Sequence, residues 1–86
     1  METFTFISDP GHGWLVVDRK ILEELGIAND ITGYSYQEDG IVYLEEDCDY
    51  STLCYAWIKS GREPFRLFNR YMEDCPIRQF EHYTVE

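Results

Sequence analysis

The chain has 86 residues and a net charge of −10 at pH 7, and this length predicts one domain, residues 1–86, with one modest hydrophobic core. The charge disfavours direct binding to nucleic acid or to anionic lipid, because both are negative, and it favours a protein partner with a basic surface. The core of so small a domain cannot easily hold seven tyrosines, five phenylalanines and two tryptophans, so some of these rings are expected at the surface, where they favour binding.

The first third of the chain predicts a hairpin and a helix. Residues 3–7 and 14–17 are rich in aromatic and β-branched side chains, and the turn sequence Asp9-Pro10-Gly11 lies between them. Asp18 is a suitable N-cap for a helix that extends to Leu25, and Gly26 follows as a helix-ending glycine.

The middle of the chain predicts a second hairpin, formed by residues 34–37 and 41–45. If Asp39 and Gly40 form a two-residue turn of type I′, Tyr36 pairs with Tyr43 and Tyr34 pairs with Glu45. The period of two then places on one face Tyr34, Tyr36, Tyr43 and Glu45, and on the other face Ser35, Gln37, Val42 and Leu44.

The last part predicts a helix from Asp49 or Ser51 to Gly61 and a strand over residues 65–72, while residues 77–85 are ambiguous between helix and extended chain. The order of elements is ββαββαβ. It predicts an α+β fold with a mostly antiparallel sheet of about five short strands and two helices on one face.

The three cysteines, Cys48, Cys54 and Cys75, are an odd number, which argues against a closed set of disulfides. No apolar run near the N-terminus resembles a signal peptide or a membrane span. We therefore expect a cytoplasmic protein with free thiols and no membrane partner. The sequence does not indicate the oligomeric state.

The loop formed by residues 10–14, Pro-Gly-His-Gly-Trp, could present His12 as a general base or a metal ligand, or it could be a turn in which His12 is incidental. A zinc site built from His12, His82 and the cysteines would lack the short spacing between ligands that structural zinc sites use. A nucleophilic cysteine, Cys48 or Cys75, paired with either histidine rests on residue identity alone. We therefore expect no cofactor, no metal and no enzymatic activity.

Acidic residues are concentrated in residues 21–58, which contain nine of them and no lysine or arginine. If Val42 and Leu44 face the core, the tyrosines of the hairpin face outward beside the acidic run at residues 45–49. The tyrosines would anchor a partner and the carboxylates would attract its basic side chains. The predicted partner-binding residues are Tyr34, Tyr36, Tyr43, Glu45, Glu46, Asp47 and Asp49. The opposite packing, with the tyrosines in the core, is the alternative, and the acidity could also serve solubility alone.

Four runs in the same order resemble a family of small uncharacterised acidic proteins of phages, prophages and plasmids. These runs are Ser-Asp-Pro-Gly-His-Gly-Trp-Leu at residues 8–15, Leu-Gly-Ile at 25–27, Tyr-Ser-Tyr at 34–36 and Tyr-Leu-Glu-Glu-Asp-Cys-Asp at 43–49. The resemblance implies no catalytic residue. By analogy, small acidic proteins of mobile elements often inhibit host defence, as anti-CRISPR proteins and DNA mimics do.

These observations favour a non-enzymatic inhibitor from a mobile element that binds a host defence protein or another protein with a basic, nucleic-acid-binding surface. Two alternatives remain. One is a small enzyme or metal-binding protein centred on His12, and the other is an acidic interaction subunit without this specificity.

Overall fold

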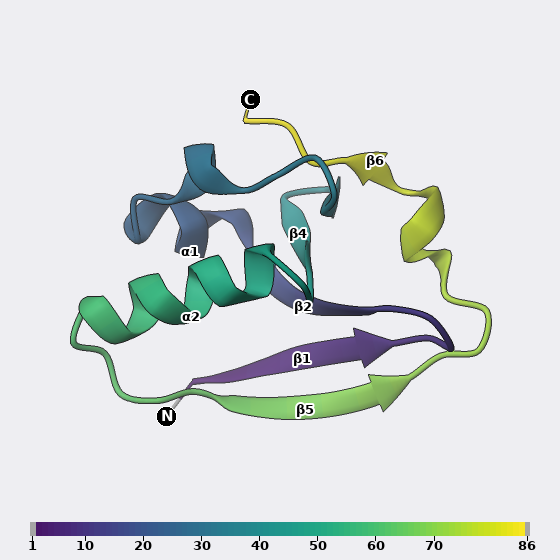
Figure 1. Cartoon of the computed structure of the whole chain (residues 1–86), viewed down its shortest axis with the longest axis horizontal. Coiled ribbons are helices and arrows are strands. Elements are labelled where there is room, and N and C mark those ends of the chain that lie inside the picture. Colours follow the sequence, from purple (N-terminus) through teal and green to yellow (C-terminus); the bar gives the residue numbers. More distant parts are fainter. Residues whose placement is uncertain (1, 86) are drawn as a thin grey trace.

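Six short strands form one sheet in the order β5-β1-β2-β4-β3-β6 in a computed structural model that describes residues 2–85 (Figure 1). The strands are β1 (Thr3–Ser8), β2 (Gly13–Asp18), β3 (Tyr36–Glu38), β4 (Ile41–Glu45), β5 (Arg66–Tyr71) and β6 (Glu81–His82). The helices are α1 (Arg19–Glu24) and α2 (Asp49–Lys59), with short 3₁₀ turns η1 (Ala28–Asp30) and η2 (Pro76–Gln79).

The α+β fold and its mostly antiparallel sheet are confirmed, with two corrections. The sheet has six strands rather than about five, because the ambiguous C-terminal segment contributes the two-residue strand β6, which pairs with β3. The sheet is also mixed, because β5 runs parallel to β1. The chain leaves β4 in the middle of the sheet and returns through α2 to the far edge, and a crossover of this kind is how parallel neighbours are joined.

Both helices lie on the same face of the sheet, as the sequence predicts (Figure 1). Alternation along β2 and β4 turns an apolar set of side chains towards this face, and α1 and α2 cover it with apolar side chains of their own. The core residues from these four elements are Leu15, Val17, Val42, Leu44, Leu22, Leu53 and Trp57. The prediction that Val42 and Leu44 face the core is therefore confirmed.

The turn between β3 and β4 has the predicted geometry. Asp39 and Gly40 have φ values of 53° and 82°, as a two-residue turn of type I′ requires. Tyr36 pairs with Tyr43, as expected. The expected pairing of Tyr34 with Glu45 is wrong, because β3 begins only at Tyr36 and Tyr34 lies in the preceding turn.

The predicted N-cap of α1 and the glycine that follows the helix are confirmed, but the predicted last residue, Leu25, is not. The side chain of Asp18 accepts a hydrogen bond of 2.9 Å from the Lys20 N–H, and Gly26 follows the helix with a φ of 73°. Helix α1 is short, however, and ends one residue before Leu25.

The face of the sheet opposite the helices is only partly covered. Alternation places Trp14 and Tyr43 on this face, where Arg78 of η2 lies over the Trp14 ring and Phe80, the residue after η2, contacts Tyr43. Gly13, which precedes Trp14, lets the Phe6 ring pack closely against the backbone of β2, because a Cβ atom at this position would lie 2.6 Å from that ring. Among residues 2–85, no helix is long and apolar enough to cross a bilayer.

Candidate functional site

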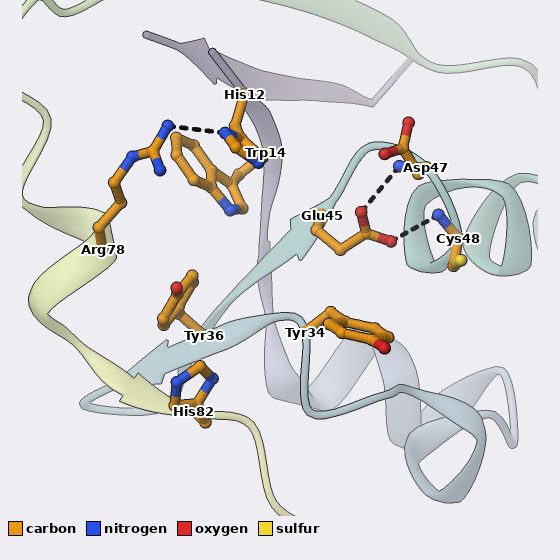
Figure 2. Close-up of a pocket in the computed structure, with 9 residues that line it drawn as sticks. All are labelled: His12, Trp14, Tyr34, Tyr36, Glu45, Asp47, Cys48, Arg78 and His82. Carbon is orange, nitrogen blue, oxygen red and sulfur yellow. Dashed lines mark hydrogen bonds between the residues drawn. The ribbon is translucent and has the colours of Figure 1, made fainter.

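An open hollow of about 320 Å³ lies beside the start of β2 and the end of β4, next to the N-terminus of α2 (Figure 2). Figure 2 shows Trp14, Tyr36 and His82 along one side, with Glu45 and Tyr34 across from them. The residues that line it are His12, Trp14, Tyr34, Tyr36, Glu45, Asp47, Cys48, Arg78 and His82.

Arg78 closes one end of this hollow and is held by the loop between β1 and β2. Its Nε and Nη2 atoms donate to the two carboxylate oxygens of Asp9 over 2.8 and 3.1 Å. The guanidinium carbon lies 5.7 Å from the centre of the Trp14 ring. The hydrogen bond from Arg78 holds the pKa of the Asp9 carboxyl well below its usual range, and the backbone N–H groups of Gly11 and His12 act in the same direction. The positive charge of Arg78 is therefore already matched by a carboxylate.

The contacts of the two histidines of the hollow determine whether Nδ1 donates or accepts in each ring. Arg78 Nη2 lies 2.6 Å from His12 Nδ1, and because a guanidinium can only donate, this ring nitrogen must accept and the His12 proton sits on Nε2. His82 Nδ1 lies 2.8 Å from the Gly33 carbonyl oxygen, which can only accept, so this nitrogen carries a proton. The two imidazoles lie at opposite ends of a row of rings, since His12 stacks on Trp14, Trp14 contacts Tyr36, and Tyr36 contacts His82.

Glu45 does not belong to an exposed acidic surface, and this part of the prediction is wrong. Its side chain turns back over the start of α2, where the carboxylate accepts N–H groups from Asp47 at 2.9 Å, Cys48 at 2.5 Å and Asp49 at 3.2 Å. The side chain of Cys48, the N-cap residue, does not cap the helix, so Glu45 supplies the cap. Glu45 is 9% exposed, and its charge lies beside the positive end of the helix.

Asp49 is fully buried, so its predicted place on the surface is also wrong. Its carboxylate accepts hydrogen bonds from the backbone N–H and hydroxyl of Thr32 and from the Ser35 hydroxyl. The Ser35 oxygen in turn accepts the Glu45 N–H over 3.0 Å. This network fastens the turn before β3 to the start of α2, which explains why Asp49 and Ser35 can be buried without unsatisfied polar groups.

The three predicted tyrosines have three different environments. Tyr34 is 73% exposed at the rim of the hollow, and Tyr36 is half-buried in its wall. Tyr43 lies outside the hollow, where its ring centre is 5.2 Å from that of Phe80, and burial raises the pKa of its hydroxyl. The structure therefore brings together Tyr34, Tyr36, Glu45 and Asp47, and it places Tyr43, Glu46 and Asp49 elsewhere. Of the four acidic residues in the predicted site, Glu46 and Asp47 are exposed.

The cysteine and metal hypotheses gain no support from the geometry. All three cysteines are free. The negative charge of Glu45 raises the pKa of the Cys48 thiol, which disfavours the thiolate that a nucleophile requires. Within residues 2–85, no cluster of three or more His, Cys, Asp or Glu side chains is arranged to hold a metal ion.

Sequence reasoning missed the contributions of Trp14 and Arg78 and did not connect His82 with Tyr36. The missing information was the pairing of β2 with β4, which puts Trp14 opposite Glu45 and so beside the second hairpin. No local signal in the sequence indicates that Arg78 returns to Asp9, because 69 residues separate them.

Comparison of the chain with protein families, with curated proteins and with solved structures finds no match.

Proposed function

We propose that this chain is a non-enzymatic binding protein whose hollow receives a lysine or arginine side chain from a basic protein surface. One observation carries the proposal: the hollow combines aromatic walls, Tyr34 and Tyr36, with the exposed carboxylate of Asp47, whereas the Glu45 carboxylate is already bound by the start of α2. Aromatic faces and carboxylates both attract cations. Arg78, the one lysine or arginine among the nine lining residues, is already paired with Asp9 and does not cancel this attraction.

The surroundings of the hollow support the same type of partner. Asp47 is exposed in its lining, Glu46 is exposed next to Asp47 in the chain, and residues 21–58 carry nine acidic residues without a basic one. Long-range attraction of this kind raises the rate of encounter with a positive surface. Together with the resemblance to proteins of mobile elements, this favours a partner whose basic groove normally holds nucleic acid, such as a host defence protein, with the chain acting as its inhibitor.

The first test uses a minimal probe. Arginine amide is titrated into labelled protein while the Trp14 indole N–H signal is followed by NMR, with citrulline amide as an uncharged control of similar shape. Arginine should shift the signal and citrulline should not. Tyr34→Ala should weaken arginine binding roughly 2–5-fold, the effect of losing an exposed cation–π contact. Equal shifts with citrulline would sink the proposal.

The second test uses the natural partner, isolated from the host by affinity purification. Charge reversal at Glu46 and Asp47 should slow association and flatten its dependence on salt, whereas Tyr34→Ala should mainly speed dissociation. An unchanged association rate at low salt would show that acidity has no role in binding and would favour the plain interaction subunit.

A small enzyme centred on His12 is the second candidate, favoured by the position of His12 in the same hollow with its Nδ1 atom held by Arg78. The variant His12→Ala separates the two candidates. The binding proposal expects His12→Ala to retain the complex and the biological effect, with Tyr34→Ala weakening both. Loss of the effect in a His12→Ala variant that still binds and is fully stable would establish the enzyme instead.

A further inference from the structure

Strand β5 forms one edge of the sheet, and the residues described leave its outer side without a partner strand. All six of its residues are exposed. Three are large and apolar or aromatic: Leu67, Phe68 and Tyr71, with exposures of 37, 60 and 59%. Natural proteins usually protect such an edge, because open backbone groups beside apolar side chains attract another strand.

The hydrogen-bonding register shows which backbone groups are open. Arg66 N–H donates to the Glu2 carbonyl and Met72 N–H to the Ser8 carbonyl, each over 2.8 Å. Because peptide groups alternate in direction along a strand, those of Arg66, Phe68 and Arg70 point towards β1. The N–H and C=O groups of Leu67, Asn69 and Tyr71 therefore point outward, where an added strand could pair with them.

The two faces of this edge differ in chemistry. Leu67 pairs with Phe4, whose side chain is in the core, so Leu67 lies on the helix face. It borders a hollow of about 480 Å³ whose walls include Trp57, Ile58 and Phe65. The alternate residues of β5 lie in a row on the opposite face: Arg66, Phe68 and Arg70.

The charge of this region is opposite to that of the rest of the molecule. Residues 59–71 contain four of the seven basic residues and one of the seventeen acidic residues, a net charge of +3, so the remaining residues carry −13. Arg62 in this segment is already paired with Glu24, but β5 itself contains two arginines and no acidic residue. The edge at β5 is therefore a basic, partly apolar surface on an acidic protein, and it is distinct from the hollow near Tyr34.

We propose that β5 accepts an extended, acidic peptide segment of another protein as a seventh strand of the sheet. In this arrangement the backbone of the segment pairs with Leu67, Asn69 and Tyr71. Every second side chain of the segment is apolar and enters the hollow beside Leu67, and the intervening side chains are acidic and meet the arginine row. This binding site is independent of the proposed function, and either can fail without the other.

A second copy of this chain fits the edge less well. Two-fold antiparallel pairing centred on Phe68 would place Arg66 opposite Arg70 twice, and like charges directly opposite each other destabilise a sheet. Pairing centred on Asn69 avoids that contact, but in either register two bodies that each carry a net charge of −10 would be brought together.

The test measures binding of a fluorescent eight-residue peptide that alternates glutamate and valine, with the matching lysine–valine peptide as control, by fluorescence anisotropy. We expect saturable binding of the glutamate peptide alone. Arg70→Glu should weaken it at least tenfold, while Lys20→Glu, which makes the same change of net charge on α1, should have less than a twofold effect. Equal losses in both variants would mean that only overall charge matters and would overturn the proposal.

The strand geometry is tested from both sides. Methylating the peptide nitrogens one at a time should weaken binding at every second position, because only alternate N–H groups face β5. Asn69→Pro removes an outward N–H without removing a hydrogen bond to β1, and it should abolish binding while far-ultraviolet circular dichroism is unchanged. If this variant does not fold, the methylated peptides still test the strand geometry.

Three outcomes contradict the proposal. The first is a methylation profile without a period of two. The second is that labelled single-stranded DNA binds more tightly than the peptide and that its binding depends on Arg70. The third is a dimer, detected by sedimentation, that dissociates in the Asn69→Pro variant. The last would assign the edge to a second copy of the chain.

Discussion

Asp49 is the residue whose role differs most between sequence and structure. In the sequence it is one of a run of acids, and in the structure it is a fully buried acceptor for Thr32 and Ser35. Asp49→Asn keeps the shape of the side chain but replaces one carboxylate oxygen with an NH₂ group. This group cannot accept the hydrogen bonds that Thr32 and Ser35 donate. We expect a loss of about 2–3 kcal/mol in the free energy of unfolding, the cost of leaving buried donors unpaired, measured by urea denaturation.

The matched control for this change is Asp47→Asn, which makes the same chemical change at an exposed position two residues away. It should alter the free energy of unfolding by less than about 0.5 kcal/mol. If the two variants were equally stable, the buried network would contribute nothing and the surface prediction for Asp49 would have to be reconsidered.

Asp9 gives the fold a predictable response to acid. Its pKa is depressed in the folded state, chiefly by the Arg78 hydrogen bond, so the unfolded state takes up its proton at a higher pH than the folded state does. Its contribution to stability is therefore complete above the unfolded pKa of 3.8 and is lost as the pH falls below that value. Urea midpoints measured from pH 6 down to pH 2 should fall less steeply in Asp9→Asn than in the wild type. Parallel curves would show that the Asp9–Arg78 contact is not formed in solution.

At the scale of elements, the start of α2 depends on a residue outside the helix. Glu45 ends β4, yet its carboxylate accepts three N–H groups around the first turn of α2. Glu45→Ala removes all three acceptors, and we expect it to reduce the free energy of unfolding by about 1–2 kcal/mol, as loss of a helix cap does. Glu46→Ala is the natural control, because it removes the same group from the next, exposed position. Thermal unfolding of both variants decides the point, and a Glu46→Ala variant as unstable as Glu45→Ala would contradict the capping role.

The elements themselves were predictable because their signals are local. Asp18 and Gly26 mark the ends of α1, and Asp39-Gly40 determines the second turn through positive φ values that few other residues adopt. Alternation in β4 was sufficient to place Val42 and Leu44 in the core. The parallel pairing of β5 with β1 was not predictable in this way, since nothing within residues 66–71 indicates which distant strand they join.

The candidate site was only partly predictable for the same reason. Alternation correctly separated Tyr36 from Val42 and Leu44, and that separation put a tyrosine in the wall of the hollow. Alternation says nothing about a side chain at the end of a strand, where Glu45 is free to turn back over α2. Burial of Asp49 depends on Thr32 and Ser35, which contact it only after the chain has folded.

At the scale of the whole molecule, the uneven charge should make stability depend on salt. The chain carries −10 within extents of 36 × 28 × 21 Å. At about 0.01 M salt the screening length is roughly 30 Å, so acidic groups repel one another across the entire fold, whereas at about 0.15 M it is roughly 8 Å and only neighbours interact. Unfolding separates these charges, and net repulsion therefore destabilises the compact state at low salt.

We expect the Tm to rise when NaCl is increased from about 0.01 to about 0.15 M, by roughly 4–8 °C if screening contributes about 1 kcal/mol in a domain of this size. The double variant Glu46→Gln, Asp47→Asn, which removes two exposed charges, should have a higher Tm at low salt and a smaller rise. Differential scanning calorimetry at both concentrations gives both quantities. A Tm that falls with salt would mean that attraction between the basic segment, residues 59–71, and the acidic remainder outweighs the repulsion. The folded chain would then satisfy its own basic edge, and an acidic peptide would have to displace that internal attraction in order to bind β5.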